Sequence, residues 1–170
     1  MGPQPVLYNK DNTQVEFTWD IGTVRAQEPS NVLEVNLWNN KGGNVLVSDL
    51  KDAYISVLDY DADTAKGDVA KNKWVQIYVP SVDGPVNEEI DDYNNEYYND
   101  KWTAIGGDTI KYLRANGITS DEYIISGEQN DGDMTNSSNN VCSFKLRIFA
   151  PPNSTAGQKL FKVKLNAYYS

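Results

Sequence analysis

The residues of this sequence that could do chemistry are mostly carboxylates, and their most regular group is Asp59, Asp61 and Asp63. Acids at alternate positions of a turn can supply oxygen ligands to a hard cation such as Ca²⁺. The EF-hand pattern is otherwise missing, because its sixth and twelfth positions hold Thr64 and Ala70 in place of Gly and Glu. The three aspartates are a weak calcium candidate, and we favour a solvated turn in which they bond to nearby backbone.

The sequence contains no histidine and a single cysteine, Cys142. Without histidine, Ser-His-Asp and Cys-His nucleophile systems and His-ligated metal sites are excluded. The setting of Cys142 in Val-Cys-Ser-Phe-Lys-Leu is typical of a strand, and the residue is predicted to be a small, buried structural residue. Glycoside hydrolysis needs two carboxyl groups with different roles, and no pair stands out among the 24 acidic residues. We therefore expect no catalytic residues, no cofactor and no metal beyond the weak calcium candidate.

Aromatic residues are more informative, because four Trp and eleven Tyr are many for 170 residues. Segment 91–102 combines aromatic rings with Asn and Asp, a composition typical of recognition loops. Its rings, which are the contact-surface candidates, belong to Tyr93, Tyr97, Tyr98 and Trp102. Such rings could contact a protein partner, stack against a sugar, or fold back to cover the edge of a sheet.

The chain carries 15 Lys and Arg against 24 Asp and Glu, which gives a net charge of −9. No basic cluster is present, and this argues against nucleic acid binding because phosphate contacts require concentrated positive charge. No apolar run approaches the roughly 20 residues that cross a bilayer, and the N-terminus lacks the pattern of a signal peptide. We expect a soluble protein that binds neither nucleic acid nor membrane.

The residues described so far must be positioned mainly by β-strands. The strongest regular signal is alternation with period two between clusters of Gly, Pro, Asn and Asp. It is clearest in segments 141–150 and 159–169, and segment 14–21 has the same pattern. The apolar face of segment 14–21 consists of Val15, Phe17, Trp19 and Ile21. Further predicted strands are 31–38, 53–60, 74–79, 102–105 and 110–114.

About eight strands predict an all-β fold, a two-sheet antiparallel β-sandwich of Ig-like or jelly-roll type. A second sheet is required because each strand has one apolar face to cover. At 170 residues, 39% of them hydrophobic, the chain is expected to form a single domain over residues 1–170. Residues 1–12 are predicted to be an extended N-terminal arm and residues 84–101 an insertion loop, and residues 127–140 a second, Asn- and Asp-rich loop that faces outward.

Several motifs together resemble small β-sandwich structural proteins of tailed bacteriophages, and the resemblance covers most of the chain. These motifs are Trp19-Asp-Ile-Gly-Thr-Val, Leu37-Trp-Asn-Asn-Lys-Gly-Gly, Ala104-Ile-Gly-Gly, Ile125-Ser-Gly-Glu and Ala150-Pro-Pro-Asn-Ser-Thr-Ala-Gly. The resemblance implies a non-enzymatic virion protein of capsid decoration, fibre or tail-associated type, assembled in the host cytoplasm in many copies. The implied partners are other virion proteins and further copies of this chain, in a homo-oligomer.

An alternative stays open, because the last of these motifs also resembles Ig-like modules of bacterial surface proteins. On that interpretation the chain is a carbohydrate-binding or adhesion module of a phage or bacterial surface protein. The Tyr- and Asn-containing segment 91–102 would then contact a cell-surface glycan.

Overall fold

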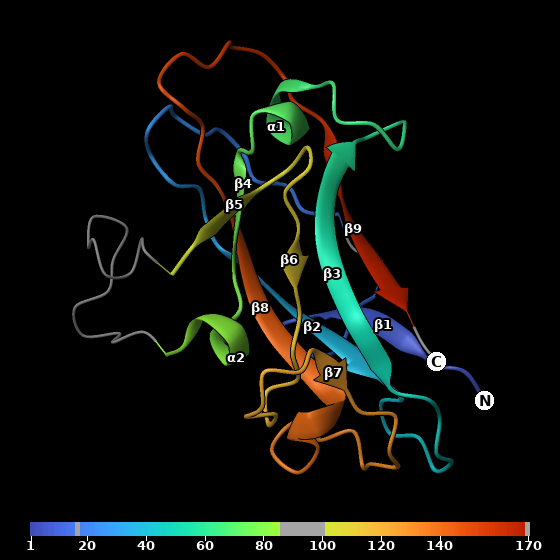
Figure 1. Ribbon diagram of the computed structural model, residues 1–170. Helices are drawn as coiled ribbons and strands as arrows, with labels where there is room; N and C mark the ends of the chain where they lie inside the picture. The colour runs from blue at the N-terminus through green and yellow to red at the C-terminus, as the bar shows by residue number, and fades with distance from the viewer. Residues whose placement is uncertain (16–17, 86–100, 169–170) are drawn as a thin grey trace.

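The computed structural model describes residues 1–15, 18–85 and 101–168, and this part of the chain folds into two antiparallel sheets that face each other (Figure 1). The predicted all-β fold, a two-sheet antiparallel sandwich, is confirmed. Little of the described chain is helical. Its helices are α1 (Asp68–Lys71), α2 (Pro80–Asp83) and a 3-10 turn, η1 (Ser138–Asn140).

The first sheet has five strands in the order β1-β2-β8-β4-β5. Their bounds are β1 (Pro5–Asn9), β2 (Leu33–Asn39), β4 (Val75–Tyr78), β5 (Thr103–Ile105) and β8 (Val141–Ile148). Strand β8 lies in the middle of the sheet and is mostly buried, because it has a neighbouring strand on each side. It pairs with β2 on one side and with β4 on the other.

The second sheet is built on β3, the longest strand of the described chain. Its strands are β3 (Leu50–Asp59), β6 (Lys111–Tyr112), β7 (Ile124–Ile125) and β9 (Phe161–Tyr168). Tyr54 of β3 pairs with Tyr112 of β6 and also with Asn166 of β9, so β6 and β9 lie on opposite sides of β3. Among the described residues, β9 has no strand partner on its other side.

The core lies between the inner faces of the two sheets, and it follows the period-two alternation of the strands. From Ala53 onward the buried positions of β3 are Ala53, Ile55 and Val57, with the intervening side chains less buried, while Leu50 is buried ahead of a register shift. Across the sandwich, Leu37 of β2 and Phe144 of β8 are almost fully buried. The four residues of α1 are too few to be stable alone, and the helix is held by burial of its apolar side chains against this core.

One predicted strand is wrong in its described part. Of segment 14–21, Val15 makes only an isolated bridge with Tyr8, and residues 18–21 form no ladder. Trp19 and Ile21 are nevertheless partly buried against the core. Their alternation therefore reflects burial of one face, which apolar side chains can achieve without backbone pairing.

The other predicted strands each contain or overlap an observed strand, and two short strands were not expected. Strand β1 forms within residues 1–12 and pairs along the full length of its five residues with β2. Strand β7 has only two residues, Ile124 and Ile125, which is too short for a period to be read from the sequence.

Candidate functional site

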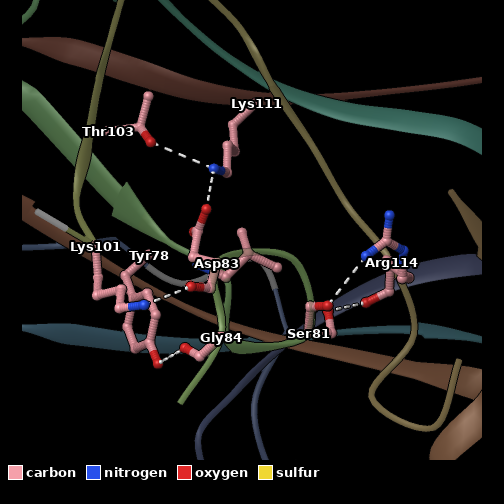
Figure 2. Close-up of polar contacts among 9 residues, drawn as sticks. Tyr78, Ser81, Asp83, Gly84, Lys101, Thr103, Lys111 and Arg114 are labelled. Carbon is pink, nitrogen blue, oxygen red and sulfur yellow. Dashed lines mark hydrogen bonds and ion pairs between the residues drawn. The ribbon is translucent and has the colours of Figure 1, made fainter. Parts of the chain in front are cut away.

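A cluster of polar contacts around α2 joins the two sheets (Figure 2). The Asp83 carboxylate accepts a bond from Lys111 Nζ of β6 at 2.6 Å, and their side chains are only 15% and 12% exposed. The second carboxylate oxygen accepts from the Val79 backbone N–H at 2.9 Å, and Lys111 Nζ also donates to Thr103 Oγ1 at 3.3 Å. Because α2 directly follows β4 of the first sheet and β6 belongs to the second, this ion pair ties the sheets together.

The same cluster holds the chain on both sides of residues 86–100. Lys101 Nζ donates to the backbone carbonyl of Asp83 at 3.1 Å, and the Tyr78 hydroxyl donates to the Gly84 carbonyl at 2.6 Å (Figure 2). The described residues that flank this segment are therefore anchored to β4 and α2.

Trp102 lies just before β5 and is only 7% exposed. Its ring packs against Tyr78 at 6.0 Å between centroids, and the Arg147 guanidinium carbon lies 4.3 Å from its centre. Arg147 is itself 3% exposed, and its Nε donates to the Gln76 side chain at 2.7 Å. Trp102 is therefore buried against the first sheet, and its role in contacting a partner stays a prediction.

The three other contact-surface candidates, Tyr93, Tyr97 and Tyr98, lie outside the described residues. Their role in contacting a partner stays a prediction.

Two aspartates of the weak calcium candidate are engaged by the protein. The Asp59 carboxylate accepts bonds from the Thr64 hydroxyl and from two backbone N–H groups, which hold its pKa below the usual value. The Asp63 carboxylate is bonded by Lys162 and lies near Lys164, and these ammonium groups lower its pKa. Nowhere in residues 1–15, 18–85 and 101–168 are three His, Cys, Asp or Glu side chains grouped so as to hold a metal ion. The bonds of Asp59 stabilise the turn, and those of Asp63 tie it to β9.

Loop 127–140 is held by its own side chains. The Asp131 carboxylate accepts from a backbone N–H and from the side chains of Asn136 and Ser137, and these bonds lower its pKa. Asn140 is 4% exposed and donates to two backbone carbonyls at the start of the loop. The loop surrounds a polar hollow of about 270 Å³.

A larger apolar groove opens between the two sheets, with a volume of about 1420 Å³. Its apolar walls include Leu33 of β2, Phe144 and Leu146 of β8, and Phe161 and Val163 of β9. Residues 18–24 also line it. The inner faces of the sandwich are therefore incompletely covered beside β9, the strand that lacks a second partner in the described chain.

Trp74 lines the same groove and is 6% exposed. Its indole N–H is buried and has no hydrogen-bond acceptor among the described residues. A buried donor without an acceptor costs about 1–3 kcal/mol.

Three tyrosine rings form a second aromatic group on the second sheet. Tyr112 of β6 is 39% exposed, stacks with Tyr123 at 5.1 Å between centroids, and packs edge-on to Tyr54 of β3 at 5.8 Å. The guanidinium carbon of Arg114 lies 4.9 Å from the centre of the Tyr123 ring. A partly exposed ring held in place by neighbouring rings is suited to stacking against a flat partner.

No protein-family model matches this chain. A search of the curated proteins likewise finds no significant match. In the described part of the chain, no helix is long and apolar enough to cross a membrane.

Sequence reasoning missed the groove and the ion pair between Asp83 and Lys111. The two charged residues lie 28 positions apart, and neither belongs to a recognisable motif. The only signal for the groove was the alternation of segment 14–21, which predicted an apolar face without showing what it covers.

Proposed function

We propose that this chain is a non-enzymatic structural protein that binds other protein subunits in many copies. The observation that carries the proposal is the apolar groove beside the edge of β9 that has no strand partner among the described residues. An uncovered apolar surface next to a free strand edge is a common site for pairing with another chain. The resemblance to small β-sandwich proteins of tailed bacteriophages supplies the context, so the proposed assembly is a virion and the partners are capsid or tail subunits.

Three of the exposed carboxylates are unsuited to act as general acids at neutral pH. Asp59, Asp63 and Asp131 have lowered pKa values because hydrogen bonds and, for Asp63, lysines stabilise their charged forms. A general acid at neutral pH requires the opposite shift.

Immunogold electron microscopy of purified virions would test the virion assignment. Antibody against this chain is expected to label particles at a regular position, and the chain is expected to co-purify with them through a density gradient. A chain that neither labels nor co-purifies with virions would contradict the proposal.

The aromatic group around Tyr112 favours a second candidate function, binding of a cell-surface glycan. Sugar rings stack on exposed aromatic faces, and Tyr112 is held in a fixed orientation by Tyr123 and Tyr54. A glycan array probed with the native protein, Tyr112→Ala and the control Tyr60→Ala would test it, since Tyr60 is 64% exposed and lies outside this group. A signal lost only in Tyr112→Ala supports glycan binding, and no signal from the native protein refutes it.

A further inference from the structure

The side of the second sheet that points away from the core carries residues of β6, β3 and β9, which lie side by side (Figure 1). The inward positions of β3 are buried, so Tyr54 and Ser56, which alternate with them, lie on the outward side. Side chains directly opposite each other in an antiparallel pair share a face. Tyr112 of β6 and Asn166 of β9 lie opposite Tyr54, and Lys164 of β9 lies opposite Ser56. These residues make up the outer face of the sheet.

The β6 end of the outer face is aromatic and rigid. Tyr112 is 39% exposed and contacts the rings of both Tyr54 and Tyr123. The Arg114 guanidinium group lies against Tyr123 and is itself held by bonds to two backbone carbonyl groups. A ring that is already ordered loses little conformational entropy on binding, so Tyr112 is suited to stack against a sugar ring.

The β9 end of the outer face is cationic. Lys162 and Lys164 contact the two oxygens of one carboxylate, that of Asp63, at 2.8 and 3.6 Å. Two ammonium groups share a single carboxylate, so positive charge is left over at this end. The longer contact is that of Lys164, whose side chain is 43% exposed. Its ammonium group can therefore bond to a second anion.

Asn166 lies between the two ends. Its side-chain amide donates to the Ser56 hydroxyl at 3.0 Å, which fixes the orientation of a group that can bond to sugar hydroxyls. Neighbouring strands are about 4.8 Å apart and residues of one face repeat about every 6.8 Å along a strand, so the Tyr112 and Lys164 backbones are about 12 Å apart. That span is longer than one sugar ring and suits a short oligosaccharide.

Acidic residues flank the aromatic end. Asp52, Asp121 and Glu122 are exposed, and the Asp52 N–H donates to the Tyr123 carbonyl at 2.9 Å. Carboxylates accept bonds from the hydroxyl groups of a neutral sugar but repel a second anion. The two ends of the outer face thus favour different parts of a ligand, hydroxyl groups beside Tyr112 and an anionic group beside Lys164.

We propose that the outer face binds an acidic oligosaccharide, with a neutral sugar ring stacked on Tyr112 and the carboxylate of another sugar residue bonded to Lys164. The net charge of −9 does not prevent this, because salt screens distant charges beyond about 8 Å and leaves the adjacent ammonium group dominant. This inference rests on the second candidate function, binding of a cell-surface glycan, and names the chemical class of that glycan.

A glycan array that holds each acidic oligosaccharide beside its carboxyl-reduced, neutral counterpart tests the proposal. Titration with labelled native protein gives an apparent Kd for each member of a pair. We expect at least one acidic member to bind about two- to fivefold more tightly than its counterpart, the gain typical of one partly exposed ion pair. The preference should shrink at high salt, because salt screens exposed charges.

Lys164→Gln should remove the preference for the acidic member and still bind both members of the pair. Lys73→Gln is the matched control, because Lys73 is 42% exposed, forms a similar ion pair with Asp108 at 3.7 Å, and lies outside the second sheet. This control should keep the preference, whereas Tyr112→Ala should lose binding to both members. Circular dichroism establishes that each variant is folded before it is applied to the array.

The outcomes separate the acidic class from glycan binding itself. Equal binding of acidic and neutral members, or a preference that survives in Lys164→Gln or is lost equally in Lys73→Gln, would overturn this inference and leave glycan binding at Tyr112 standing. No signal from the native protein would overturn both. The virion assignment is decided separately, by antibody labelling of particles.

Discussion

Asp83→Ala removes one partner of the ion pair that joins the two sheets. In the native protein Lys111 is 12% exposed and is bonded to Asp83 at 2.6 Å, with Thr103 Oγ1 as its second acceptor at 3.3 Å. The substitution leaves the Lys111 ammonium in the same partly buried place with only the weaker acceptor. It also removes the acceptor of the Val79 backbone N–H.

Breaking a fully buried ion pair by deleting one partner costs about 3–5 kcal/mol, because the remaining charge stays desolvated. Here both side chains keep some exposure, so water can reach Lys111, and we expect a loss of about 2–3 kcal/mol in the free energy of unfolding. For a chain of this size that loss corresponds to a Tm about 4–12 °C lower.

Urea denaturation followed by tryptophan fluorescence measures the effect, together with thermal unfolding by circular dichroism. A double-mutant cycle with Lys111→Met isolates the pair, and we expect a coupling energy of at least about 1 kcal/mol. Asp108→Ala is the control, because Asp108 is 95% exposed and its ion pair with Lys73 spans 3.7 Å. Additive single effects, or a Tm change no larger than that of the control, would refute the reasoning.

Three further predictions concern single side chains. Burial raises the Cys142 pKa from 9.0 to about 12, so the free energy of unfolding should fall as pH rises above 9. A thiol reagent at pH 8 should label only unfolded protein. Rapid labelling of folded protein would contradict this. Trp102→Ala should lower the free energy of unfolding by about 3–5 kcal/mol because it empties a buried site, and an unchanged Tm would show that the ring is dispensable. The lowered Asp131 pKa adds stability that is present above pH 3.8 and lost at lower pH. The free energy of unfolding of the Asp131→Asn variant should therefore depend less on acid pH than that of the native protein. Equal acid unfolding curves for the two proteins would argue against this.

The positions of strands could be predicted where one face of the strand is buried along its length and the other face is more exposed. In β3 the buried residues Ala53, Ile55 and Val57 follow the alternation that predicts the strand. Segment 14–21 has an equally regular pattern, and its described part forms no ladder. The pattern reports which side chains are buried, whereas a ladder also requires a partner strand edge at the right distance and orientation.

The candidate sites divide in a similar way. The buried position of Cys142 could be predicted locally, because it is a small apolar residue within a predicted strand. The burial of Trp102 could not, since it depends on Tyr78 and Arg147, which come from other strands. The sequence around Trp102 is the same whether its ring faces solvent or packs against the Arg147 guanidinium group.

The sequence by itself determined the all-β class, the absence of histidine chemistry and the alternation that separates inner from outer faces. These properties depend on residue types and on the period of the backbone, and both are local. Only the tertiary structure decided that Asp83 meets Lys111, that Trp102 is covered, and that the sandwich is open beside β9. Each of these depends on which distant strands become neighbours, and pairing of that kind is set by the packing of the whole core.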